Sequence, residues 1–271
     1  SLTGEVFVWH DILYDGPRNA GWPTNDTLIA RAWFIGQATR GGLDIEHILR
    51  TLQNQYRKIA NAEAYERIVL WFDACLFDQA ILAHILACML HQGVRKAELL
   101  CVDAFPGIEP FHGLGQLNPA QLAVSVTEDQ FQFAKVVDKA FANQDLQLFA
   151  ELSRLTSAPL PWIPAAVARW LLAHPNPSTA LGRLDSLALQ AISGGCTTPA
   201  EIFSAVAAAD TPPQYWGDIT LWAKINGLAN RQPPLVQIDG PTPRLPQWEG
   251  IADLQRFRIT CLPDKENTYS A

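Results

Sequence analysis

The chain has few positively charged side chains: 20 Lys and Arg residues face 27 Asp and Glu residues, which gives a formal net charge of −7. Affinity for nucleic acids rests mainly on the neutralisation of phosphates by Lys and Arg, so this balance argues against a general polyanion binder. Most of the excess negative charge lies in residues 1–159, which have 12 basic and 18 acidic side chains. Residues 160–271 have 8 basic and 9 acidic side chains. Only the second half can approach nucleic acid without strong repulsion.

Long apolar runs are also absent, although 48% of the residues are hydrophobic and supply an ample core. No stretch of eighteen apolar residues occurs, and the first residues lack the basic-then-apolar layout of a signal peptide. The cysteines are odd in number and lie in or beside apolar segments, which is typical of reduced thiols. We therefore expect a cytoplasmic protein without membrane contact. The cysteines are Cys75, Cys88, Cys101, Cys196 and Cys261.

Recognised catalytic and metal-binding motifs are missing. The sequence has no Cys-x-x-Cys, no His-x-x-x-His and no complete catalytic triad or phosphate loop. His84 and His91 are seven residues apart on one expected helix, about 10 Å along its axis, which is too far to share one ion. We expect neither a metal nor a cofactor.

Two segments carry most of the functional information, residues 6–17 and residues 68–79. Each is a β-branched and aromatic run that ends in a Trp, an acid and a polar loop. Acidic residues at strand ends are where α/β proteins often bind ligands.

The first part of the chain is predicted to alternate strands and helices. The strand at 67–72, the helix at 78–92 and the strand at 97–102 form a βαβ unit. This order favours a short, mainly parallel, Rossmann-like sheet. The expected strands are 5–9, 67–72 and 97–102, and the expected helices are 25–39, 45–60 and 78–92.

The second part is predicted to be mostly helical. Helices are expected over 118–122, 128–143, 145–155 and 163–173, then over 184–193, 198–209 and 218–230. Strands at 235–238 and 257–261 follow, and three helices before a two-stranded arm are the layout of a winged helix. Proline clusters favour a boundary within 174–179. The expected domains are an α/β domain at 1–115, a helical connector at 116–175 and a winged-helix-like domain at 176–271.

Several blocks of the sequence match the pattern of one known protein family. The first matching block is Trp-x-Asp-x-Leu-x-x-Gly-Pro, at Trp9, Asp11, Leu13, Gly16 and Pro17. The second is Leu-Trp-Phe followed by Phe-Asp-Gln, at Leu70, Trp71, Phe72, Phe77, Asp78 and Gln79. A loose Gly-x-Leu match lies within residues 113–117, and residues 181–185, 217–218 and 234–235 are similar to the helical, winged region that commonly follows.

With these blocks, the chain resembles the bacterial domain-of-unknown-function family 1835. This resemblance implies an α/β domain with a helical tail and brings no established activity. Similar proteins usually begin with a further strand and a Gly-Asp-Ser turn, the part most like a phosphate loop. The domain at 1–115 is therefore expected to lack its first strand, either because the sequence is clipped or because this member has lost that site.

Four acids are expected at or just beyond strand ends, where parallel strands bring side chains to one edge. They are Asp11, Asp73, Asp78 and Asp103. Paired carboxylates there can act as acid and base or hold a divalent ion. The alternative is structural, with Asp78 capping a helix and Asp11 and Asp15 fixing a turn, and we favour it. Further candidate contacts at this edge are Trp9, His10, Arg31, Trp71, Gln79 and His112.

The tail offers candidate contacts for nucleic acid or a protein partner. These are Lys224 on the third expected helix and Arg244, Arg256 and Arg258 on the arm. Acidic and amide side chains on the same helix make it a poor match for phosphates, so we favour a protein partner over DNA.

Three functional hypotheses follow. The first is a binding or regulatory module, with a small-molecule ligand or a protein partner at the sheet edge. The second is an enzyme acting on a nucleotide or phosphate ester, with Asp11 and Asp73 as acid, base or metal ligands and His10 or His112 assisting. The third is a transcription regulator that binds DNA through the tail. The sequence does not determine the oligomeric state.

Overall fold

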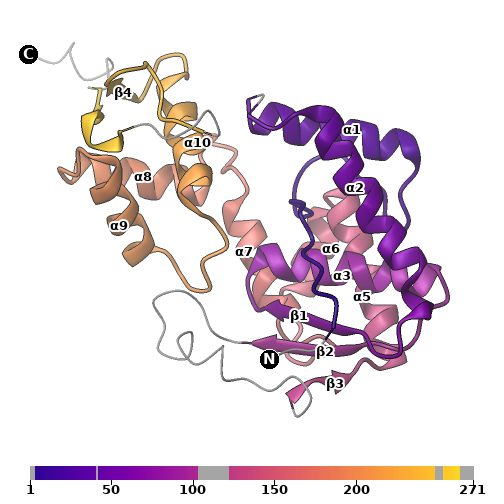
Figure 1. Cartoon of the computed structure of the whole chain (residues 1–271). Helices are drawn as coiled ribbons and strands as arrows, with labels where there is room; N and C mark the ends of the chain where they lie inside the picture. The colour runs from indigo at the N-terminus through magenta and orange to yellow at the C-terminus, as the bar shows by residue number, and fades with distance from the viewer. Residues whose placement is uncertain (1–3, 41, 103–121, 248–252, 263–271) are drawn as a thin grey trace, which may run out of the picture. The chain divides into compact units, whose positions relative to one another are not determined.

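A computed structural model of the chain describes residues 4–40, 42–102, 122–247 and 253–262 (Figure 1). The chain divides into two compact units. The first comprises Ser1–Ala38 and Leu43–Leu171, and the second comprises Thr39–Gly42 and Leu172–Ala271. None of the helices within the described ranges is long and apolar enough to cross a membrane.

A small sheet in the first unit has the strand order β1-β2-β3. Strands β1 (Val69–Asp73) and β2 (Glu98–Val102) are parallel, with Asp73 opposite Val102, and the short β3 (Val124–Ser125) is antiparallel to β2. The helix α3 (Leu76–His91) connects the two parallel strands and lies next to them in Figure 1. The expected α/β class with a parallel strand pair is confirmed.

Helix α3 is apolar on all sides and nearly all of its residues are buried, as expected of a helix inside a core. It packs against α5 (Glu128–Asn143), whose Thr127 and Gln130 form a capping box. Helices α6 (Leu146–Leu152) and α7 (Ile163–Ala173) follow. Helices α5 and α6 lie in the segment expected to be a connector, yet they belong to the first unit, because the apolar face of α5 is needed to cover α3.

The N-terminal segment forms no strand within residues 5–9, where one was expected. The backbone N–H of His10 donates instead to Oε1 of Gln55, at 2.6 Å. Val6, Phe7 and Val8 are exposed, so their β-branched and aromatic character alone does not make a strand in the absence of a paired neighbour. Helices α1 (Asn25–Ala38) and α2 (Ile45–Ala60) follow, and the short η1 (Ala62–Ala64) precedes β1.

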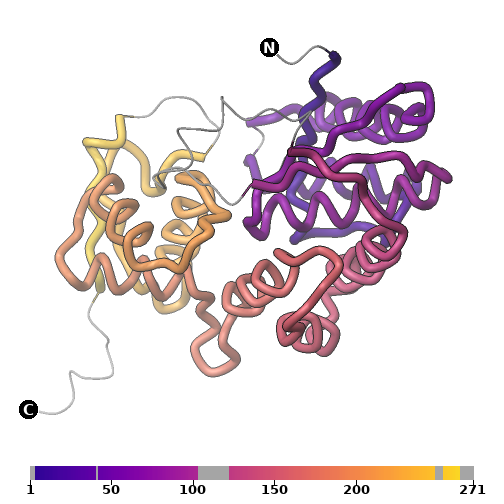
Figure 2. Tube along the Cα trace, turned by 90° about the horizontal axis from the view of Figure 1, so that it is seen from below, coloured from indigo at the N-terminus to yellow at the C-terminus, as the bar shows by residue number. Residues whose placement is uncertain are grey.

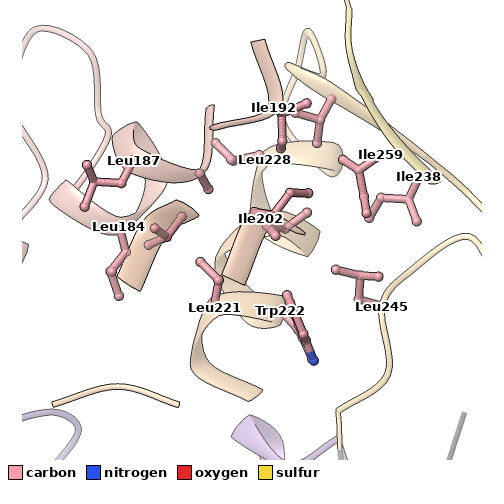
Figure 3. Close-up of a cluster of buried hydrophobic side chains, with 14 of the residues drawn as sticks. Leu184, Leu187, Ile192, Ile202, Leu221, Trp222, Leu228, Ile238, Leu245 and Ile259 are labelled. Atoms are coloured by element: carbon pink, nitrogen blue, oxygen red, sulfur yellow. The ribbon is translucent and has the colours of Figure 1, made fainter. Parts of the chain in front are cut away.

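The second unit contains helices α8 (Arg183–Ser193), α9 (Pro199–Ala209) and α10 (Asp218–Ala229). The strands β4 (Val236–Asp239) and β5 (Arg258–Cys261) pair antiparallel, and η3 (Leu254–Arg256) precedes β5. Both strands pack against these helices, and the yellow end of the trace in Figure 2 lies beside them. The apolar side chains of both strands and all three helices form one core, drawn in Figure 3. The N–H of Ile259 also donates to the carbonyl of Thr197, at 2.8 Å.

Candidate functional site

The candidate site lies where β1 ends and α3 begins. Asp73 is the last residue of β1, Cys75 is the N-cap of α3 and Asp78 lies in its first turn. The N–H of Cys75 donates to Oδ1 of Asp73 at 2.6 Å, and the N–H of Asp73 donates to Oδ2 of Asp78 at 2.7 Å. The tight turn from strand to helix therefore holds both carboxylates in place. Asp78 was expected to cap this helix, but the N-cap is Cys75, and the Asp78 carboxylate accepts the N–H of Asp73 instead.

These side chains form a cluster of potential ligands. One atom from each of Asp73, Cys75 and Asp78 lies within 4.8 Å of the others. Gln79 is fully buried beside them, and its Nε2 donates to the backbone carbonyl of Asp73 at 2.6 Å. Its Oε1 is buried and has no hydrogen-bond partner among the described residues. The sequence predicted that Asp73 and Asp78 could hold a divalent ion at a strand end, but it did not predict Cys75 as a third potential ligand.

The side chains of the cluster differ in their readiness to lose a proton, because burial and neighbouring charges shift the pKa of Asp78 and of Cys75. Burial, together with the charge of Asp73, raises the pKa of Asp78 to about 6, despite the opposing hydrogen bond from the N–H of Asp73. Burial and the same neighbouring charge raise the pKa of the Cys75 thiol far above its usual value. Cys75 therefore stays a thiol, which argues against a nucleophilic role. Asp78 can both accept and donate a proton near neutral pH.

Asp11 and Arg31 form a separate buried ion pair. Nε of Arg31 donates to Oδ1 of Asp11 at 2.8 Å, and both side chains are almost fully buried. The Arg31 guanidinium also donates to the carbonyls of Ile12 and Asp15. This pair fixes the turn after residue 11, and the interactions of Asp11 within the described ranges do not include Asp73.

Among the described residues, the remaining predicted contacts make no hydrogen bond to the cluster, and two further candidates lie outside these residues. Trp9 packs edge-on against Tyr56 with a centroid distance of 5.2 Å, inside the first unit. Trp71 lies on β1 and is 38% exposed. His10 lines a groove against α2, described further below. Asp103 and His112 lie outside the residues that the structure describes.

The first unit contains a buried polar network that the sequence did not predict. NH1 of Arg18 donates to Oδ1 of Asp138 at 2.6 Å, and Nδ1 of His84 lies 2.9 Å from the same oxygen. Nε2 of His84 lies 2.7 Å from the Tyr56 hydroxyl. His84 is only 1% exposed, because α3 is covered on all sides.

Asp138 is the charged centre of this network. Its burial favours the neutral form, but His84, Arg18 and the N–H of Gly21 outweigh that effect and lower the pKa of Asp138 to about 2. A signal for it exists in the sequence, because Asp138 occupies a position of the apolar stripe that includes Phe131, Ala134 and Phe141. A charge at a core position of an amphipathic helix requires a buried partner.

The tail candidates differ in exposure. Arg256 and Arg258 are exposed, whereas Lys224 and Arg244 are half-buried. NH1 of Arg258 donates to the carbonyls of Gln255 and Phe257, both at 2.7 Å, so part of this guanidinium is held by its own arm. The arrangement offers two exposed cations near β5.

The chain was also compared with known proteins. Comparisons of the chain with protein-family models, with curated proteins and with solved structures find no match.

Proposed function

We propose that the protein is a cytoplasmic binding or regulatory module with a ligand site at the carboxyl end of β1. The observation that carries this proposal is the convergence of the Asp73 and Asp78 carboxylates with the buried Oε1 of Gln79, which has no hydrogen-bond partner among the described residues. All three offer oxygen acceptors, so the complementary ligand carries N–H or O–H donors or is a cation. A bare phosphate would be repelled unless a divalent ion bridged it to the carboxylates.

A thermal-shift screen of the chain against divalent ions, nucleotides and phosphosugars tests this proposal. A ligand at about a hundred times its dissociation constant stabilises by about 2.7 kcal/mol, which raises Tm by roughly 2–4 °C in a domain of this size class. We expect Asp73→Asn to abolish the shift. The matched control Asp129→Asn, an exposed acid in the first turn of α5, should keep it. A shift that survives Asp73→Asn, or no shift with any compound, would argue against this site.

The second candidate is an enzyme acting on a nucleotide or phosphate ester at the same cluster. The raised pKa of Asp78, about 6, favours it, because such a carboxyl can exchange protons at neutral pH. In this version Asp78 replaces Asp11 as the partner of Asp73, since Asp11 is paired with Arg31. Hydrolysis that requires a divalent ion and is lost in Asp78→Asn would support it. Binding without turnover would favour the first proposal.

We also propose a Rossmann-like arrangement for the first unit and a winged-helix arrangement for the second, in line with the resemblance to family 1835. The βαβ order supports the former, and the three helices with a returning hairpin support the latter. We assign the second unit to contact with a protein partner. The DNA-binding alternative predicts a duplex affinity that falls steeply with salt and with Arg256→Gln and Arg258→Gln. Absence of that affinity at low salt would dismiss the alternative.

A further inference from the structure

A groove of about 440 Å³ lies in the first unit, between the N-terminal segment and α2. Phe7, Val8 and His10 line one side. The other side is one face of α2, because its residues are spaced three and four apart. The lining residues of α2 are His47, Arg50, Thr51, Asn54 and Gln55.

The lining of the groove contains potential cations and no acid. His10, His47 and Arg50 are exposed, and within the described part of the chain their side chains make no hydrogen bond or ion pair. Free donors that converge on one groove are the feature of a site for an anion.

Gln55 adds a buried donor to this lining. Its Oε1 accepts the N–H of His10 at 2.6 Å, which fixes the orientation of the amide. Gln55 is only 1% exposed, and its Nε2 is buried without a hydrogen-bond partner among the described residues. A buried donor without an acceptor is costly, and a ligand oxygen at the groove would relieve that cost.

We propose that this groove binds a small organic anion. Its phosphate or carboxylate group accepts hydrogen bonds from Arg50, His47 and the Gln55 amide. An apolar or planar part of the ligand packs against Phe7 and Val8, whose side chains are 42% and 58% exposed. This site is independent of the carboxylate cluster at the end of β1, which favours ligands of the opposite charge.

Isothermal titration calorimetry of the full chain with phenyl phosphate, benzoate and inorganic phosphate tests the proposal. We expect phenyl phosphate or benzoate to bind more tightly than inorganic phosphate, and the tighter of the two identifies the anionic group. Arg50→Gln should weaken that binding about tenfold, through loss of a charge-assisted hydrogen bond. His47→Gln should weaken it to a smaller extent. Both positions are exposed on α2, so neither change disturbs the core.

Two further variants sharpen the test. Phe7→Ala should weaken binding of phenyl phosphate and leave that of inorganic phosphate unchanged, because only the former has an apolar group. Arg154→Gln, which removes an exposed Arg outside the groove, should change neither. The proposal is overturned if none of the three probes binds at millimolar concentration. It is also overturned if Arg50→Gln binds the preferred probe as tightly as the unchanged chain.

Discussion

Asp138 shows how one buried charge can hold several parts of the first unit together. It accepts hydrogen bonds from Arg18 and from the N–H of Gly21, and it contacts His84 of α3. The N-terminal segment, α3 and α5 therefore meet at a single carboxylate. Because the Arg18 and Asp138 side chains are 3% and 0% exposed, water cannot replace either partner if the other is lost.

Asp138→Asn is expected to destabilise the protein by about 3 kcal/mol, because it leaves the buried Arg18 guanidinium without a counter-ion. Urea unfolding at neutral pH measures the change. Asp129→Asn on the same helix is the control, since Asp129 is exposed, and we expect it to stay within about 0.5 kcal/mol of the unchanged chain. An equal effect at both positions would contradict the role given to the network.

The same carboxylate predicts a pH dependence. The pKa of Asp138 falls from 3.8 to about 2 on folding, so its charged form is favoured in the native state. The stabilisation is fully present above the unfolded value and is lost as the pH falls through the folded value. Between about pH 4 and 2, the stability of the unchanged chain should decrease more steeply than that of Asp138→Asn. Parallel slopes in acid unfolding curves would refute this assignment.

Asp78 is predicted to titrate with a midpoint close to its raised pKa of about 6. Its carboxyl carbon can be followed by NMR as the pH changes. Asp73→Asn should lower the pKa of Asp78 by removing a neighbouring negative charge, but not to the ordinary value, because burial is the larger cause. A midpoint near 4 in the unchanged chain would remove the main support for acid–base chemistry at the cluster.

Among the secondary-structure elements, the observed bounds of the helices agree with the sequence-based predictions more closely than those of the strands. Helices were expected over 45–60, 128–143 and 163–173, and the structure has α2, α5 and α7 over the same residues. Apolar periodicity and caps act within a segment, so they are readable in one dimension. A strand needs a paired neighbour. Residues 5–9 were expected to form a strand but do not, and the N–H of the adjacent His10 donates to the side chain of Gln55 on α2.

Thr198 provides a test of local capping. Its hydroxyl accepts the N–H of Glu201, and the Glu201 carboxylate accepts the N–H of Thr198 at 3.0 Å, which completes a capping box. Thr198→Ala should destabilise the second unit by about 1 kcal/mol in thermal unfolding. Thr198→Ser keeps the hydroxyl and should retain most of the stability. If the two variants are equally unstable, the loss comes from the methyl group rather than from the cap.

At the scale of the whole molecule, each unit has its own buried interior. The second unit is centred on residues such as Ile202, Leu221 and Ile259, which are fully buried (Figure 3). The first unit is centred on α3 and α5, with Leu86 and Val137 also fully buried. Because each unit has its own core, we expect one unit to be able to lose its structure without the other.

Leu221→Ala and Val137→Ala test this separation. Removal of buried methyl groups leaves cavities, and Leu221→Ala should cost about 3 kcal/mol, with a smaller loss for Val137→Ala. Hydrogen exchange read by mass spectrometry should show faster exchange in residues 172–262 for the first variant and in the first unit for the second. Faster exchange throughout the chain in either variant would indicate one cooperative unit.

The α/β class and the extents of most helices follow from the sequence, because periodicity, caps and apolar runs are local properties. The parallel strand pair follows from the order strand, helix, strand. It also placed Asp73, Asp78 and Gln79 at the end of a strand, where the structure brings them together. Tertiary structure alone decided that Asp11 pairs with Arg31 and that Asp138 pairs with Arg18. These partners are 20 and 120 residues apart, and only the packing of the helices brings their charges within hydrogen-bond distance.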